Sequence, residues 1–400
     1  MGQKYGGSPV GSPNAALMLS SPTSHDMHFM ERALELARKG VGLASPNPTV
    51  GCVIVKDGAI LGEGFHQYEW RDHAEIVALK QAGERARGAT MFVTLEPCNH
   101  TGRTGPCTEA IIAAGISRVV AAMEDPNPKT GGSGFARLCS AKVDVETGVL
   151  GSEARKLNEG FAHWITTKKP FVTLKSALTL DGQLALAQTR GKRKAPSEGG
   201  RYKRASRTWI SSEESRAEVQ RMRHASDALL TGIGTVLADD PFLTDRSGLE
   251  RRRLLLRVIL DTKLRLSPRT RVVQTADDDL LVFTTASLKS PKARKLQSAG
   301  VELVQLKAPG GKVDLQTVMK ELGRREILSV LLEAGPRLNG AALAAGIVQK
   351  LVLFFAPKLA GHSDVPFFSP PAAKFPAFHF TSTRQFGPDI ALEAYLTRNL

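Results

Sequence analysis

Two short segments of the sequence combine residue types that bind metals and move protons. The first, His73-Ala74-Glu75, stands at the start of a predicted helix, and the second is EPCNHTGRTGPC, residues 96–107, with eight residues between its two cysteines. One histidine and two cysteines supply three zinc ligands and leave a fourth position open, which is typical of catalytic sites. Zinc lowers the pKa of a bound water towards neutrality, and the nearby Glu75 carboxylate can transfer the proton.

The choice of ligands within the second segment has alternatives. Cys98 and Cys107 could be core residues or a disulfide pair, and His100 could replace Cys107 as the third ligand. We predict His73, Cys98 and Cys107, because Cys107 begins a predicted helix and a helix N-terminus favours a thiolate. The order of the motifs is that of zinc-dependent nucleobase deaminases, which have two residues between the cysteines instead of eight. The longer loop adds residues placed to bind a substrate, namely Asn99, His100, Arg103 and Thr104, and its arginine and backbone amides suit a phosphate.

Composition and charge exclude several classes of protein. The 400 residues are 42% hydrophobic and 23% charged, which is typical of a soluble protein of two or three domains. No apolar run is long enough to span a membrane, and the run at residues 15–19 is too short for the core of a signal peptide. Four cysteines in 400 residues argue against a disulfide framework. We therefore expect a cytoplasmic protein. The net charge of +15 is typical of nucleic-acid binding, but Arg190–Arg207 holds eight basic residues against Glu198 alone. We therefore expect a basic surface loop and no nucleic-acid partner.

Hydrophobic periodicity predicts a layered α/β domain over residues 25–165. Residues 1–24 are rich in Gly, Ser and Pro, which predicts a disordered extension. An Asp57-Gly58 pair between two apolar runs predicts a β-hairpin. The expected helices are Asp26–Lys39, His73–Arg85, Cys107–Ala114 and Gly151–Gly160, and the expected strands are Val50–Lys56, Ala59–Phe65, Thr90–Leu95 and Ser117–Met123.

A linker at Thr166–Pro170 is expected to lead into a second α/β domain over residues 166–400. This region has no Gly-x-Gly-x-x-Gly after its first strand, so a Rossmann fold is not supported. Polar residues instead stand at its strand ends, at Lys175, Asp181-Gly182 and Glu333-Ala334-Gly335, where ligands of open α/β sheets bind. The expected strands are Phe171–Ser176, Asp227–Thr231, Leu254–Asp261, Leu280–Thr284, Val301–Leu306, Ile327–Leu332 and Lys350–Ala356, and the expected helices are Ser212–His224, Pro291–Ala299, Leu315–Leu322 and Pro336–Ala345.

These motifs resemble one enzyme family along most of the chain. HAE and LEPCNHTGRTGPC, with PNPTVGCVIV before them and DPNP after them, closely resemble the deaminase domain of the bifunctional riboflavin-biosynthesis deaminase-reductases. LKSALTLDG, TWIS, TGIGTVLADDPFLT, VILD and FFAPKLAG resemble the reductase domain of the same family. The resemblance implies a cytidine-deaminase-like α/β/α domain followed by a dihydrofolate-reductase-like α/β domain that uses NADPH.

The resemblance also implies a reaction and its residues. The reaction is hydrolytic deamination of 2,5-diamino-6-(5-phosphoribosylamino)pyrimidin-4(3H)-one, then NADPH-dependent reduction of the ribosyl chain to give 5-amino-6-(5-phosphoribitylamino)uracil. In the deaminase domain, His73, Cys98 and Cys107 match the ligands of one zinc ion, Glu75 the acid/base, and Asn47, His100 and Arg103 the substrate contacts. In the reductase domain, Ala177, Trp209, Thr235, Asp239 and Gly335 match cofactor contacts, and Arg223, Leu243, Arg246 and Glu333 match substrate contacts.

The sequence departs from the family pattern at residues 188–207, a basic insertion. Arg207 stands where the family often has a substrate-contacting serine, so a deaminase with an impaired reductase is one alternative. A nucleic-acid-editing zinc deaminase leaves the second domain unexplained, and a non-catalytic zinc-stabilised binding protein does not need Glu75. We expect a small phosphorylated pyrimidine as substrate, no nucleic-acid or membrane partner, and a homo-oligomer.

Overall fold

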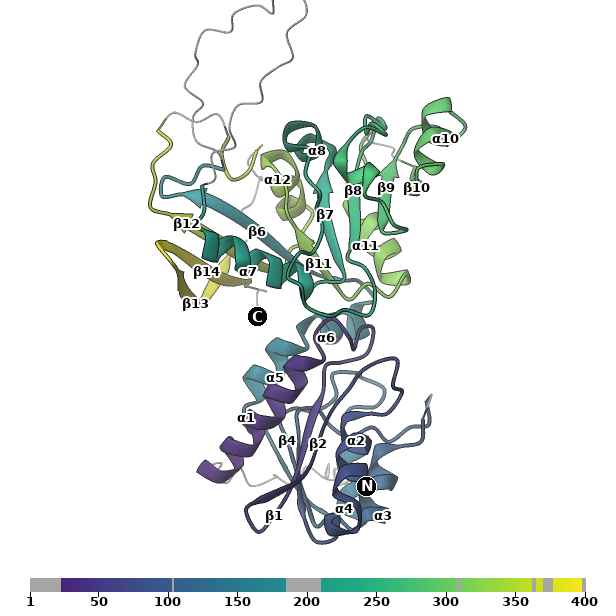
Figure 1. Ribbon diagram of the computed structural model, residues 1–400, viewed down its shortest axis with the longest axis vertical. Helices are drawn as coiled ribbons and strands as arrows, with labels where there is room; N and C mark the ends of the chain where they lie inside the picture. The colour runs from purple at the N-terminus through teal and green to yellow at the C-terminus, as the bar shows by residue number, and fades with distance from the viewer. Residues whose placement is uncertain are drawn as a thin grey trace, which may run out of the picture.

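The computed structural model describes residues 23–102, 104–184, 210–307, 311–361, 365–369 and 377–397. It contains two α/β domains, one above the other in Figure 1, joined through helices α5 (Gly151–Leu157) and α6 (Glu159–Thr167). None of the described helices is long and apolar enough to cross a membrane. Residues 1–22 of the expected extension, the whole basic insertion, Arg103 and Trp209 lie outside the described residues.

The N-terminal domain is a five-stranded mixed sheet between two helical layers. Its strands are β1 (Gly51–Lys56), β2 (Ala59–Phe65), β3 (Thr90–Val93), β4 (Arg118–Ala121) and β5 (Asp144–Thr147), and its helices before α5 are α1 (Ser24–Lys39), α2 (Ala74–Ala82), α3 (Cys107–Ala114) and α4 (Ser133–Ser140). The strand order is β2-β1-β3-β4-β5, with β1 antiparallel to both neighbours and β3, β4 and β5 parallel. Helices α1 and α5 lie on one face, and α2, α3 and α4 lie on the other (Figure 1).

Two glycines of β2 let helix α2, which carries Glu75, lie directly on the sheet. A Cβ added at Gly62 would come within 2.2 Å of the Ala78 carbonyl oxygen, and one added at Gly64 would come within 2.2 Å of the Ala74 carbonyl oxygen. Both oxygens belong to the backbone of α2, so any larger residue would push the helix away from the close-packed sheet. The glycines therefore allow α2 to pack directly against β2.

The C-terminal domain is a nine-stranded sheet in which seven parallel strands end in an antiparallel pair. Its strands are β6 (Phe171–Thr179), β7 (Ala228–Gly232), β8 (Leu256–Leu260), β9 (Leu280–Thr284), β10 (Val301–Gln305), β11 (Ser329–Leu332), β12 (Lys350–Ala356), β13 (Phe378–Phe386) and β14 (Asp389–Leu396). Its helices are α7 (Glu213–His224), α8 (Ile233–Asp239), α9 (Arg271–Gln274), α10 (Pro291–Gln297), α11 (Leu315–Arg324) and α12 (Pro336–Ala344). The order β10-β9-β8-β7-β11-β6-β12-β14-β13 puts β6, β7 and β11 side by side.

The alternation of side chains along β9 shows how this sheet is covered on both faces. Leu280 and Val282 belong to a core cluster with α8, α9 and α10, whereas Leu281 and Phe283 belong to a cluster with α11 and α12. All five residues of β9 are buried, as expected for a parallel strand between two helical layers. The sheet therefore exposes its strand ends, where ligands of open α/β sheets bind.

The structure corrects the expected connection between the domains. The predicted helix Gly151–Gly160 is interrupted at Asn158, which separates α5 from α6. The Asn158 side chain accepts a hydrogen bond from the Thr49 N–H at 2.7 Å and donates to the Thr49 carbonyl at 3.0 Å. The predicted linker Thr166–Pro170 is too long, since Thr166 and Thr167 complete α6. The Trp164 indole of α6 donates to the Gly323 carbonyl at 2.9 Å. The boundary near residue 165 stays a prediction.

Other differences concern short elements. Helix α2 ends at Ala82 instead of Arg85, because Gly83 adopts φ 59 and begins a 3-10 turn, Gly83–Ala86. The sequence analysis missed α4, α8, α9, β5, β13 and β14, most of which are four to eight residues long. Segments of that length show too few turns or alternations for a periodic pattern to identify them.

Candidate active sites

The donor atoms of His73, Cys98 and Cys107 converge in the N-terminal domain. The Sγ atoms of Cys98 and Cys107 lie 3.5 Å and 3.2 Å from Nδ1 of His73, and all three donor atoms lie within 4.8 Å of one another. Three elements position them, since His73 caps α2, Cys98 follows β3 and Cys107 begins α3. One imidazole nitrogen and two sulfurs fit Zn²⁺ with one coordination position left for water.

The predicted alternative ligand, His100, is not part of this group. Among the residues that the structure describes, only His73, Cys98 and Cys107 form a cluster able to hold a metal ion. His100 is exposed, and the N–H of Cys107 donates to the Cys98 sulfur at 3.4 Å, as a helix N-terminus does to a thiolate. The geometry therefore brings Cys107, and not His100, to the site.

Glu75 lies in the first turn of α2 and is 4% exposed. Burial raises the pKa of its carboxyl, which suits a group that accepts and returns a proton near neutral pH. The hydrogen bond between the two cysteine side chains lowers the pKa of the Cys98 thiol and raises that of Cys107. The thiolate is the form of cysteine that binds metals, so Cys98 is the sulfur that ionises more readily.

Asn47 and His66 form a pair beside the metal-binding residues. Nδ2 of Asn47 lies 2.9 Å from Nε2 of His66, and Nδ1 of His66 lies 3.0 Å from the Asp72 carbonyl oxygen. Because a carbonyl oxygen only accepts, Nδ1 carries a proton, and in the neutral ring Nε2 accepts from the Asn47 amide. The His66 ring is 3% exposed and its centroid is 5.3 Å from that of His73. The sequence analysis found Asn47 but missed His66, a histidine directly after a hairpin strand.

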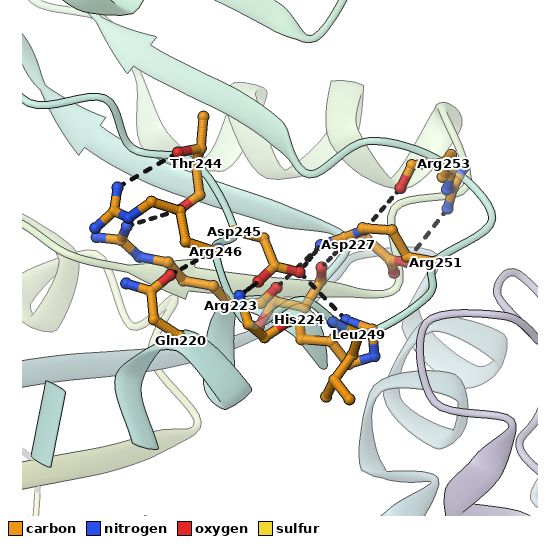
Figure 2. Close-up of polar contacts among 12 residues, drawn as sticks. Gln220, Arg223, His224, Asp227, Thr244, Asp245, Arg246, Leu249, Arg251 and Arg253 are labelled. Carbon is orange, nitrogen blue, oxygen red and sulfur yellow. Dashed lines mark hydrogen bonds and ion pairs between the residues drawn. The ribbon is translucent and has the colours of Figure 1, made fainter. Parts of the chain in front are cut away.

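The predicted substrate contacts of the C-terminal domain lie together. Nε and Nη2 of Arg223 donate to the two carboxylate oxygens of Glu333 at 2.7 Å and 2.9 Å, and Nη1 donates to the Thr244 carbonyl at 2.9 Å. Figure 2 shows Arg223, Thr244 and Arg246 in one cluster. Arg246 is exposed, and its Nη1 donates only a long bond of 3.4 Å to the Thr244 hydroxyl. Arg223 is therefore committed to Glu333, whereas Arg246 can bind a ligand.

Glu333 has a basic neighbour on the adjacent strand. Leu332, the last residue of β11, pairs with Leu174 of β6. Glu333 and Lys175 are the next residues along these two neighbouring segments. Burial raises the pKa of Glu333, but the charges of Arg223 and Lys175 outweigh this effect and lower the pKa to about 2. Burial lowers the pKa of Lys175. A lysine whose pKa is lowered gives up its proton more readily, so Lys175, which the sequence analysis named only as a polar residue near a strand end, is also a candidate proton donor.

The predicted cofactor contacts lie on β6, α8 and the start of α12. Ala177 is on β6, Thr235 and Asp239 are on α8, and Gly335 precedes α12. A Cβ added at Gly335 would meet no heavy atom within 4 Å, so a ligand phosphate can approach the backbone before α12, although Pro336 has no N–H and the Leu338 and Asn339 N–H groups donate to the Gly335 carbonyl. This arrangement fits a phosphorylated cofactor.

Leu243 differs from the other predicted substrate contacts. Its side chain is 3% exposed and belongs to a core cluster with Ile233 and Val236. Its φ of 61° is one that residues other than glycine rarely adopt. The buried side chain is not available to a substrate, so a contact at this position would have to use the backbone.

The chain matches known families and proteins over most of its length. Residues 23–123 match the cytidine and deoxycytidylate deaminase zinc-binding region, and residues 170–392 match the RibD C-terminal domain. The riboflavin biosynthesis protein RibD of Escherichia coli (strain K12) is 41% identical over 383 residues, which are 92% of this chain and 98% of that protein. That of Aquifex aeolicus (strain VF5) is 42% identical over 336 residues, 84% of this chain and 88% of that protein.

Solved structures agree with these matches. RibD of Acinetobacter baumannii is 37% identical with a TM-score of 0.78, covering 94% of this chain and 99% of that one. A Thermotoga maritima diaminohydroxyphosphoribosylaminopyrimidine deaminase/5-amino-6-(5-phosphoribosylamino)uracil reductase is 36% identical with a TM-score of 0.76, covering 93% and 99%. The predicted fold classes and the predicted place in riboflavin biosynthesis are confirmed, and a nucleic-acid-editing deaminase is not favoured. The chain belongs to the RibD family of riboflavin biosynthesis proteins, with a zinc-binding deaminase domain followed by a reductase domain.

Proposed function

We propose that the deaminase domain removes the 2-amino group of 2,5-diamino-6-(5-phosphoribosylamino)pyrimidin-4(3H)-one. The reductase domain then uses NADPH to reduce the ribosyl chain, giving 5-amino-6-(5-phosphoribitylamino)uracil. The convergence of His73, Cys98 and Cys107 close to the buried Glu75 carries the proposal. The Thermotoga maritima protein, described by the same two activities, supports it.

In the deaminase site, His73, Cys98 and Cys107 would hold zinc, which supplies Lewis-acid activation of the attacking water. The Glu75 carboxylate takes a proton from that water and returns it to the leaving amino group, which departs as ammonia. The raised pKa of Glu75 suits both transfers. Asn47 offers its Oδ1 to a donor group of the substrate, because its Nδ2 is already bonded to His66.

In the reductase site, NADPH supplies the hydride that reduces the sugar carbon. Lys175 provides the proton that the sugar oxygen takes up, and its lowered pKa favours that transfer. Glu333, ionised and held by Arg223 at both oxygens, keeps a negative charge beside Lys175. The exposed guanidinium of Arg246 suits the substrate phosphate, which arginine can bind through two parallel hydrogen bonds.

Cofactor choice, location and assembly complete the proposal. NADPH follows from the family resemblance, and the accessible start of α12 at Gly335 supports a phosphorylated dinucleotide. The cytoplasmic location and the homo-oligomeric state stay predictions from the sequence.

We expect Arg246→Ala to raise the reductase KM for the phosphorylated substrate by at least roughly tenfold, because it removes a charge-assisted hydrogen bond to the phosphate. The value of kcat should change much less, since the contact is made in the ground state as well as in the transition state. Steady-state NADPH oxidation measures both constants. Arg325→Ala is a matched control, because Arg325 pairs with Glu302 and Glu321 instead. An unchanged KM in Arg246→Ala would remove Arg246 from the phosphate site.

A further inference from the structure

Two loops of the deaminase domain that flank its active site are held by the reductase domain. Loop 40–47 ends at Asn47, and loop 66–72 runs from His66 to the residue before His73. Both contact residues 244–253 of the reductase domain, which we call the bridging segment. A cavity of about 320 Å³ between the domains is lined by residues of both, including Asn47 and Arg251. The reductase domain therefore forms part of the surroundings of the deaminase site.

One residue of the bridging segment, Arg252, binds both loops at once. Its backbone N–H donates to the Gly42 carbonyl at 2.9 Å, and its Nη1 donates to the Ser45 carbonyl at 3.0 Å. Its Nε donates to Glu69 at 2.7 Å, and its guanidinium carbon lies 3.8 Å from the centroid of the Tyr68 ring. Because Glu69 is 68% exposed, its ion pair contributes little. The carbonyl bonds and the cation–π contact carry the attachment.

The two loops are connected to each other and to the pair formed by Asn47 and His66. The Tyr68 N–H donates to the Leu43 carbonyl at 3.2 Å, and the Asn47 N–H donates to the Ala44 carbonyl at 2.9 Å. The Asn47 side chain is bonded to His66 at 2.9 Å. A displacement of either loop would therefore move Asn47 relative to the metal-binding residues.

The neighbours of Arg252 anchor the bridging segment within the reductase domain. Nη1 of Arg251 binds Asp245 at 3.1 Å, and its Nη2 donates to the Ser226 carbonyl at 2.9 Å. Asp245 also lies 3.2 Å from Nδ1 of His224, whose Nε2 lies 3.3 Å from the Val41 carbonyl of the deaminase domain. Figure 2 shows Arg251, Asp245 and His224 pointing toward one another. The segment is thus fixed before Arg252 extends to the loops.

We propose that Arg252 is a positioning residue for the deamination reaction, supplied by the reductase domain. By holding loops 40–47 and 66–72 together, it sets Asn47 at the distance from the metal-binding residues that the substrate requires. The inference rests on the proposed function, since it takes Asn47 as a contact of the deaminase substrate. It couples the two domains, because a residue of the reductase domain holds two loops of the deaminase domain.

Arg252→Ala is expected to raise the deaminase KM by roughly tenfold while kcat falls less than about threefold, because the loss affects substrate binding and not Glu75 or the metal ligands. Arg252→Lys keeps the charge but lacks the planar fork, so it should recover only part of the affinity. Lys156→Ala is the matched control, because Lys156 forms another ion pair between the domains, to Glu393 at 2.6 Å. Lys156 lines the same cavity but forms no hydrogen bond or ion pair with the described residues of either loop, so the deaminase KM of this variant should match that of the wild type.

Ammonia release by the full-length variants measures these constants, and hydrogen–deuterium exchange of residues 40–47 and 66–72 measures loop order directly. An unchanged KM in Arg252→Ala, with the wild type active, would overturn the positioning role and leave the proposed function intact. An equal rise in Lys156→Ala would also overturn it, by assigning the effect to docking in general. If the wild type released no ammonia, the proposed substrate would fail. Exchange would then decide, with faster exchange of both loops in Arg252→Ala supporting the positioning role and unchanged exchange contradicting it.

Discussion

Glu75→Gln is expected to keep the zinc ion and to lose deamination by at least ~10²-fold. Glutamine has nearly the same shape as glutamate but cannot accept a proton from water and return it to the leaving amino group. The metal should be retained, because the three donor atoms come from His73, Cys98 and Cys107. Zinc content by elemental analysis and ammonia release by the same preparation test both halves of the expectation.

Glu109→Gln is the matched control for this experiment. Glu109 also lies in the first turn of a helix of the deaminase domain, but it pairs with Arg137 and is exposed. Its substitution should leave zinc content and deamination unchanged. Normal turnover by Glu75→Gln would exclude Glu75 as the proton carrier, and loss of zinc from that variant would show that Glu75 acts on metal binding.

Cys107→Ser should lose both zinc and deamination. We expect about one zinc per chain in the wild type and a metal affinity lower by more than about 100-fold in the variant, since even residues that only support a ligand cost up to this factor. Serine does not replace the thiolate, because its hydroxyl stays protonated near neutral pH. Competition with a chromogenic chelator measures the affinity.

Two further variants decide the identity of the third ligand. Cys139→Ser removes an exposed cysteine of α4 and should retain zinc, and His100→Ala should do so as well. Zinc retention with full deamination in Cys107→Ser, together with zinc loss in His100→Ala, would reverse the ligand assignment. Reduction of an already deaminated substrate should be normal in all three variants.

The zinc site could be predicted because each of its motifs is local. Glu75 follows His73 by two residues, and Cys107 opens a helix whose bounds, Cys107–Ala114, were predicted correctly. The bounds of β9 were likewise predicted from its apolar run. A strand that is buried on both faces is recognised from that run alone. Each of these features depends on residues close together in the chain.

The contacts between the domains could not be predicted, because they depend on residues far apart in sequence. Arg251, Arg252 and Arg253 are consecutive. The Arg251 side chain nevertheless binds within the reductase domain, whereas the Arg252 side chain binds the loops of the deaminase domain. Arg252 reaches Glu69 and Ser45 across 183 and 207 residues. From the sequence, three adjacent arginines only add positive charge. His66 was missed for the same reason, since its role appears only with Asn47 and Asp72 beside it.

The most direct test of the proposed two-step reaction is a single assay with two separate readings. The purified chain is supplied with 2,5-diamino-6-(5-phosphoribosylamino)pyrimidin-4(3H)-one, with and without NADPH, while ammonia release and NADPH oxidation are recorded independently. We predict that ammonia is released in both conditions, and that one NADPH is oxidised per ammonia once the deaminated intermediate has formed. Ammonia release without NADPH oxidation would leave a deaminase with an inactive reductase domain, and the absence of both would contradict the proposed substrate.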